Sequence, residues 1–170
     1  MDPFTAVYSE NQVIVPTQSE ADSLLHDGYG YRINKTHILW SVEALYNAER
    51  GKITVVDEVT NTILSFQELL HRLSENDFDI WVNFIVYKDL RTRGFIIKVS
   101  ENDFKVYERG DYSNKSPSYQ LKIISEGKPE TIKHLITELK NTNDRSLKMK
   151  IAVIDRRGEI VYYGLEEKYL

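Results

Sequence analysis

The order of apolar segments after residue 80 constrains the fold of this chain more than any other feature. Five short runs typical of strands occur at residues 95–99, 104–108, 119–125, 148–154 and 159–163. Two segments have apolar residues at helical spacing: residues 80–93, which end at Gly94, and the segment with Ile132, Leu135, Ile136 and Leu139. One helix, three strands, a second helix and two strands predict a sheet packed by helices, in the α+β or α/β class.

The first half of the chain predicts shorter, mixed elements. A helix is expected at residues 19–25, and another after Asn34 or Thr36 that runs to Gly51, followed by a strand at 52–56. Ser65 with Glu68 three residues on is a capping box, which predicts a further helix start. The polar, acidic residues 74–79 favour two domains, 1–79 and 80–170. The opening residues 1–5 resemble a vector-derived remnant and are left out of this fold prediction.

Charge and composition narrow the class of protein. Residues 1–79 hold 5 Lys+Arg against 13 Asp+Glu, a balance of −8, whereas residues 80–170 hold 17 against 13, a balance of +4. A basic half suggests a surface that faces a polyanion on one side only. The absence of cysteine excludes disulfides and thiolate chemistry. No run of eighteen apolar residues and no signal peptide occurs, so we expect a cytoplasmic protein without membrane contact.

Catalytic and metal motifs are scarce. The four histidines, His26, His37, His71 and His134, have no partner at metal-ligand spacing and are expected to be ordinary surface or half-buried residues. Glu126-Gly127-Lys128 has the letters of a metal-nuclease motif but lies in a loop. No glycine-rich phosphate loop occurs, and no metal or cofactor is expected.

Four blocks of sequence carry a family resemblance. Residues 86–95 (VYKDLRTRGF), 103–110 (DFKVYERG), 151–155 (IAVID) and 158–163 (GEIVYY) resemble, in order and spacing, the archaeal tRNA-intron endonucleases. Residues 42–52 and 65–70 are similar to the N-terminal domain of that family. The resemblance implies a small mixed α/β N-terminal domain and a C-terminal, restriction-endonuclease-like mixed β-sheet flanked by helices. It also implies cleavage of precursor tRNA at bulge-helix-bulge junctions, without a metal, to 2′,3′-cyclic phosphate and 5′-hydroxyl ends.

The family's reaction uses a Tyr as base, a His as acid and a Lys that stabilises charge on the phosphate. The family Tyr corresponds to Tyr107. Ser116 stands where the His is expected, and Leu147 where the Lys is expected. Lys148 could substitute only if the strand register slipped by one residue, which would turn it to the opposite face. With two of three positions lost, the chain resembles the structural partner of a catalytic subunit in an α2β2 heterotetramer.

Two surfaces follow from the same resemblance. The last strand would pair with a partner subunit through Ile160, Val161, Tyr162, Tyr163 and Leu165. The loop before it, which in the family is acidic and enters a basic groove, keeps Asp155 and Glu159 but also carries Arg156 and Arg157. RNA contact would fall to Lys140, with Arg145 as the alternative. Two other readings stay open: a self-sufficient nuclease with a degenerate triad, and an RNA-binding module without cleavage.

Overall fold

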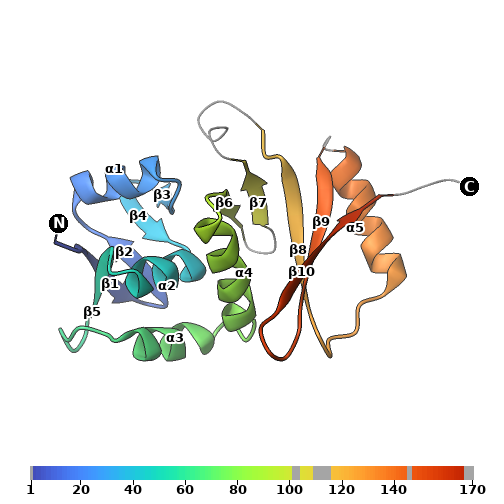
Figure 1. Ribbon diagram of the computed structural model, residues 1–170. Coiled ribbons are helices and arrows are strands. Elements are labelled where there is room, and N and C mark those ends of the chain that lie inside the picture. The colour runs from blue at the N-terminus through green and yellow to red at the C-terminus, as the bar shows by residue number, and fades with distance from the viewer. Residues whose placement is uncertain (1, 101–103, 109–115, 145–146, 167–170) are drawn as a thin grey trace, which may run out of the picture. The chain divides into compact units, whose positions relative to one another are not determined.

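The computed structural model describes residues 2–100, 104–108, 116–144 and 147–166. The chain forms two compact units, Met1–Phe84 and Ile85–Leu170, and each is described by itself (Figure 1). Both contain a five-stranded sheet and helices, so the predicted α+β class is confirmed.

The first unit is built on a mixed sheet with the strand order β3-β4-β2-β1-β5. Its strands are β1 (Phe4–Ser9), β2 (Gln12–Val15), β3 (Tyr31–Ile33), β4 (Thr36–Leu39) and β5 (Ile53–Asp57). Its helices are α1 (Gln18–His26), α2 (Ser41–Glu49) and α3 (Phe66–Ser74). Buried apolar residues from the sheet and the helices, among them Val13, Leu24, Leu45, Val55 and Leu69, form its core.

Two predictions for this unit are wrong. Phe4 and Thr5 belong to the fold, because β1 pairs in parallel with Ile53 and Thr54 of β5. The helix expected from Asn34 or Thr36 begins only at Ser41, and residues 36–39 form strand β4 instead. A short run such as His37-Ile38-Leu39 fits either structure locally, and pairing with β2 makes it a strand.

Carboxylates fix the starts of two helices in the first unit. The predicted capping box at α3 is present: Ser65 Oγ accepts the Glu68 backbone N–H at 3.3 Å, and Glu68 Oε2 accepts the Ser65 N–H at 2.8 Å. At α2, the buried carboxylate of Glu43 accepts backbone N–H groups from Trp40 at 3.0 Å and Gly30 at 2.8 Å. Glu43 therefore connects the start of α2 to the loop that precedes β3.

The second unit has the strand order β10-β9-β8-β7-β6. Its strands are β6 (Ile96–Val99), β7 (Phe104–Tyr107), β8 (Tyr119–Ser125), β9 (Lys148–Ile154) and β10 (Ile160–Leu165). Helix α4 (Ile80–Thr92) begins in the first unit and continues into the second, and α5 (Ile132–Asp144) connects β8 to β9. The predicted order of helices and strands is confirmed, and β8 and β9 have the predicted bounds.

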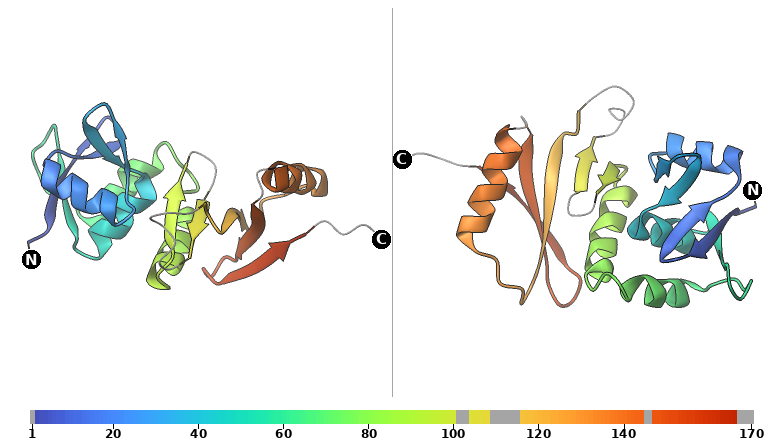
Figure 2. Two further views of the ribbon diagram at one scale, coloured as in Figure 1. Left: turned by 90° about the horizontal axis from the view of Figure 1, so that it is seen from above. Right: turned by 180° about the vertical axis from the view of Figure 1, so that it is seen from behind.

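Strand register places α4 and α5 on opposite faces of this sheet (Figure 2). Tyr162, Ala152 and Ile123 are neighbours across β10, β9 and β8, so they share one face. Tyr162 contacts Asp89 of α4 on that face, whereas Lys122, the residue before Ile123, contacts α5 on the other. Only the β8–β9 pair is parallel among the pairs described in this sheet. Consequently β8 and β9 have their carboxyl ends at the same end of the sheet.

Candidate functional site

Tyr107, the candidate base, ends strand β7 and is 8% exposed. It pairs with Ile96 of β6 in the sheet register. Burial raises the pKa of the Tyr107 phenol, so the group holds its proton more firmly than an exposed tyrosine does. A base with a raised pKa is less available for proton abstraction near neutral pH.

The expected acid and cation positions, Ser116 and Leu147, each lie shortly before a strand. Ser116 is exposed and precedes β8, and two residues further on the Ser118 N–H donates to the Val106 carbonyl at 2.8 Å. Leu147 is half-buried, and its N–H donates to the Thr142 carbonyl at 3.1 Å where α5 leads into β9. A serine hydroxyl is not a general acid near neutral pH, and a leucine side chain carries no charge to stabilise a phosphate.

Register determines which way Lys148 faces. Val106, Tyr119 and Lys148 are neighbours across β7, β8 and β9 and therefore share a face of the sheet. Tyr107 follows Val106 directly, so it points to the opposite face. The described pairing thus separates Tyr107 and Lys148, and it does not favour Lys148 in the expected role of the cation.

Of the two candidate RNA-binding residues, the structure describes only Lys140. Lys140 is exposed on α5, one turn before the end of the helix. Arg145 lies outside the described residues. Their role in RNA binding stays a prediction.

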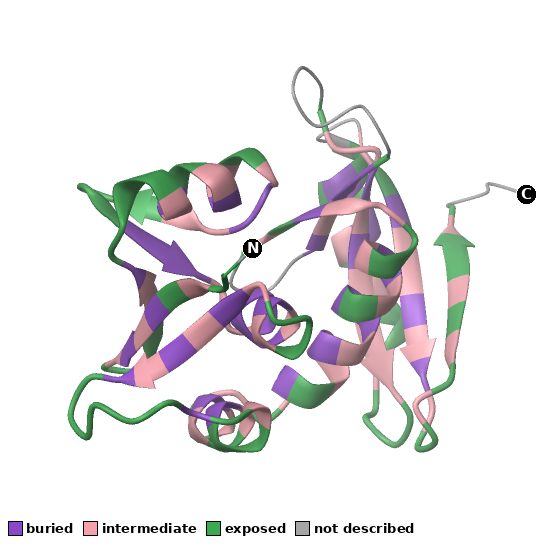
Figure 3. Ribbon diagram, turned by 60° about the vertical axis from the view of Figure 1, so that its left-hand side comes forward, coloured by how far each residue is buried: buried purple, intermediate pink, exposed green. Residues whose placement is uncertain are grey.

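Strand β10 is an edge strand with one open side among the strands described in this sheet. Val161 and Tyr163 are 50% and 52% exposed, and Leu165 is half-buried on the same face. In Figure 3 the strand that leads to the C-terminus carries bands coloured as exposed. Ile160 and Tyr162 are half-buried and face α4. An edge strand with exposed apolar side chains is a template for pairing with another chain, as the predicted interface requires.

A cluster that the sequence analysis did not anticipate holds β10 against α4. The Tyr162 hydroxyl donates to Asp89 Oδ2 at 2.6 Å, and the Arg93 guanidinium pairs with the same oxygen at 3.2 Å. The Arg93 guanidinium carbon also lies 5.3 Å from the centroid of the Tyr162 ring. Burial and, next, the Asp89 hydrogen bond raise the pKa of Tyr162, so its proton is retained. The i,i+4 spacing of Asp89 and Arg93 is visible in the sequence, but Tyr162 lies 73 residues from Asp89, so spacing does not predict this contact.

In the turn between β9 and β10, the carboxylate of Asp155 binds backbone groups of the same turn. Asp155 Oδ1 accepts the backbone N–H groups of Arg157 and Glu159, each at 2.8 Å. Asp155 is therefore engaged within its own turn, while Glu159 is exposed. Their expected role in a subunit contact stays a prediction.

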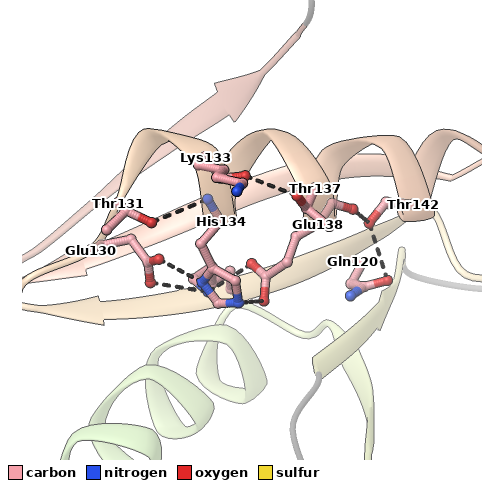
Figure 4. Close-up of polar contacts among 9 residues, drawn as sticks. Gln120, Glu130, Thr131, Lys133, His134, Thr137, Glu138 and Thr142 are labelled. Carbon is pink, nitrogen blue, oxygen red and sulfur yellow. Dashed lines mark hydrogen bonds and ion pairs between the residues drawn. The ribbon is translucent and has the colours of Figure 1, made fainter.

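On the face opposite α4, Lys122 joins β8 to α5 through Glu130 and Glu138, the two carboxylates that lie on either side of His134 in Figure 4. Lys122 Nζ lies 3.1 Å from Glu130 Oε2 and 2.6 Å from Glu138 Oε2. His134 lies between the same carboxylates, at 2.6 Å from Glu130 Oε1 and 3.5 Å from Glu138 Oε1. The expectation that no histidine has a carboxylate at such spacing is therefore wrong, because Glu130 and Glu138 lie four residues to either side of His134. Lys122 occupies the space between the carboxylates, so we interpret the cluster as a clasp that fixes α5 on the sheet.

His37 also differs from the ordinary half-buried residue that was expected. It is 1% exposed, and neither ring nitrogen has a hydrogen-bond partner among the described residues. Burial and, next, the charge of Arg32 lower the pKa of His37, so the ring stays neutral.

The described residues contain no group of three or more His, Cys, Asp or Glu side chains that could hold a metal ion. In the same part of the chain, no helix is both long and apolar enough to cross a membrane.

Comparison with known proteins relates both units to one family. A family model of the tRNA intron endonuclease N-terminal domain matches residues 4–70, and one of the tRNA intron endonuclease catalytic C-terminal domain matches residues 80–162. Together these matches cover most of the chain, and the first begins with Phe4 of β1.

Three curated relatives named tRNA-splicing endonuclease illustrate the similarity. One from Thermococcus onnurineus is 33% identical over 143 residues, covering 81% of this chain and 80% of the relative. One from Methanococcus vannielii is 28% identical over 163 residues, covering 94% of this chain and 92% of the relative. One from Methanococcoides burtonii is 33% identical over 130 residues, which is 76% of this chain but only 36% of that longer relative. The chain thus matches nearly the full length of some relatives and about a third of others.

Proposed function

Because the chain belongs to the tRNA intron endonuclease family, we propose that it is the structural subunit of a tRNA-splicing endonuclease. In this proposal it assembles with catalytic subunits into an α2β2 heterotetramer that cleaves precursor tRNA at bulge-helix-bulge junctions in the cytoplasm. The chain contributes the fold and a pairing surface, and its partner contributes the chemistry.

One observation carries the proposal: the candidate acid and cation positions hold Ser116 and Leu147. In-line transfer to a 2′,3′-cyclic phosphate needs a base and an acid on opposite sides of phosphorus and a cation where negative charge develops. Tyr107 alone supplies neither the acid nor the cation. Register supports the same conclusion, because Lys148 shares a face with Val106 and not with Tyr107.

The retained Tyr107 has a structural explanation. Its ring is buried at the end of β7, and its raised pKa suits a packed phenol better than a base. The exposed edge of β10, with Val161 and Tyr163, supplies the surface on which a partner strand could pair.

A mixing assay tests the proposal. The purified chain, the catalytic subunit encoded in the same genome, and their mixture are each incubated with a precursor tRNA that contains a bulge-helix-bulge. We expect cleavage to 2′,3′-cyclic phosphate and 5′-hydroxyl ends only in the mixture. Cleavage by this chain alone would instead identify a self-sufficient nuclease. Binding of the RNA without cleavage or assembly in any combination would identify an RNA-binding module.

The variant Tyr107→Phe sharpens the assay. It removes only the hydroxyl from a packed ring, so the cleavage rate of the mixture should change by less than about twofold if Tyr107 is not the base. A loss on the order of a hundredfold or more, the size typical of losing a general base, would place Tyr107 in the reaction and refute the structural role. Circular dichroism of the variant shows whether the fold is retained.

A further inference from the structure

Strand β10 is weakly embedded in its own sheet. None of its six residues is buried, whereas β9 beside it holds the buried side chains of Met149, Ala152 and Ile154. As an edge strand, β10 pairs with β9 alone among the described strands. Apolar packing therefore contributes little to its attachment, and segments of this kind open more readily than the core of a domain.

One side chain connects β10 to a helix. Within the described part of the chain, Tyr162 is the only residue of β10 whose side chain makes a hydrogen bond, an ion pair or a ring contact. Its hydroxyl donates to Asp89 Oδ2 at 2.6 Å, and its ring centroid lies 5.3 Å from the guanidinium carbon of Arg93. Asp89 and Arg93 pair with each other at 3.2 Å on α4, so the three side chains close a ring of contacts. We call Asp89, Arg93 and Tyr162 the β10 latch.

The geometry of the β10 latch fixes the direction of the tyrosine ring as well as its distance from α4. The i,i+4 pairing with Arg93 orients the Asp89 carboxylate, and a hydrogen bond to a charged acceptor is stronger than one between neutral groups. The hydrogen bond is partly buried, so water competes for it less than at an open surface. The hydroxyl thus fixes the ring of Tyr162, and with it the backbone near the centre of β10.

The place of the β10 latch within the strand bears on the predicted pairing surface. Val161 and Tyr163 precede and follow Tyr162, and alternation along the strand directs them to the opposite, exposed face. Fixing Tyr162 therefore fixes the backbone from which both of these side chains project. A partner that meets an ordered edge avoids the entropic cost of ordering that edge on binding.

We propose that Tyr162, held by Asp89 and Arg93, is a positioning residue for subunit pairing: it keeps β10 docked on α4, so that the open edge of the strand is ordered before a strand of the catalytic subunit pairs with it. This inference rests on the proposed function and adds the residues that prepare the pairing strand. When the latch is broken, the apparent affinity for the partner falls in proportion to the fraction of molecules in which β10 is docked. A tyrosine with a purely structural role would lower the stability of the fold and leave that affinity unchanged.

The variant Tyr162→Phe tests the proposal in the full chain, because it keeps the ring and removes only the hydroxyl. Its matched control is Ser65→Ala, which removes the cap of α3 in the first unit and leaves β10 unchanged. Affinity for the catalytic subunit is measured by calorimetry well below the melting temperature, and hydrogen exchange of the β10 amides is measured in the free chain. We expect Tyr162→Phe to bind at least about fivefold more weakly and its β10 amides to exchange at least about fivefold faster than in wild type. The control should match wild type within about twofold in both measurements.

A second variant tests the β10 latch as a unit. Asp89→Ala removes the acceptor of the hydrogen bond, so adding Tyr162→Phe to it should weaken partner binding by less than about a further twofold, because both changes break the same contact. Losses of affinity that simply add in the double variant would show that the two residues act independently, and would overturn the inference.

The remaining outcomes also decide the question. Wild-type affinity in Tyr162→Phe would overturn the inference, and so would an equal loss in Ser65→Ala, which would reduce the effect to general stability. Weaker binding without faster exchange in β10 would show that the hydroxyl contacts the partner directly, which also contradicts a positioning role. If the wild-type chain itself fails to assemble with the catalytic subunit, the proposed function fails and the pairing role with it, and the exchange rates alone then decide whether the latch holds β10.

Discussion

The hydroxyl of Tyr162 gives a stability prediction that can be worked out from its contacts. In Tyr162→Phe the ring remains, and only the 2.6 Å hydrogen bond to Asp89 is lost. Hydrogen bonds to charged groups contribute about 1.5–3 kcal/mol, and the lower end applies because Asp89 keeps its pairing with Arg93 at 3.2 Å. We therefore expect the free energy of unfolding of the second unit to fall by about 1.5 kcal/mol. For a domain of this size, that lowers the melting temperature by roughly 6–12 °C.

The control for this prediction is the neighbouring Tyr163→Phe. Tyr163 is 52% exposed on the opposite face of β10, and its hydroxyl has no hydrogen-bond partner among the described residues. We expect its loss to change stability by less than about 0.5 kcal/mol. Thermal and urea unfolding, followed by circular dichroism, compare the two variants. Equal melting temperatures would refute the reasoning that the Asp89 contact stabilises β10.

Titration of the same hydroxyl predicts a loss of stability at high pH. The folded-state pKa of Tyr162 is raised above the unfolded value of about 10, so its contribution is complete below that pH and is lost as pH rises further. Burial, the largest cause, raises the pKa of Tyr119 in the same way, to about 12. Wild type should therefore lose stability above pH ~10, and Tyr162→Phe should lose less. An identical alkaline slope for the two proteins would contradict the assignment.

The first unit offers three further tests. Ser65→Ala removes the side-chain cap of α3 and should destabilise this unit by about 1 kcal/mol in urea unfolding; no change would mean that the cap is dispensable. His37 has a lowered pKa, so its contribution is present above pH ~6.5 and is lost as pH falls. Wild type should therefore melt at a lower temperature at pH 5.5 than at pH 7.5, and this drop should be smaller in His37→Leu. An equal drop in both proteins would exclude His37 as its cause. Gly30→Ala places a Cβ 2.6 Å from the Ile38 carbonyl oxygen at a φ of +75° and should destabilise the unit by about 3 kcal/mol; wild-type stability would show that the backbone relaxes freely.

Local chemistry made much of the fold predictable. Ser65 and Glu68 define the start of α3 by themselves, because both partners of the capping box lie within one turn. Strands β8 and β9 were placed with their observed bounds because their apolar runs are long and bounded by turn residues. The prediction failed where runs were short: residues 36–39 were assigned to a helix, and β3 has only three residues.

The identities at the candidate site could likewise be read by counting along the chain. The family resemblance places Ser116 and Leu147 at the expected acid and cation positions by the spacing of the blocks, and this assignment stays a prediction. Register was needed for the rest, because a strand reverses its face at every residue and spacing does not show which neighbours share a face. Only the paired strands place Lys148 with Val106 and not with Tyr107.

The sequence by itself thus determined the order of elements in the second unit, the cap of α3 and the residue types at positions 116 and 147, because each depends on neighbours within a few positions. The tertiary structure alone decided the contact of Tyr162 with Asp89, the burial of His37 and the connection of Glu126 to the backbone N–H of Arg156. These contacts join residues far apart in the chain. Their geometry exists only after strand pairing and helix packing have brought the segments together.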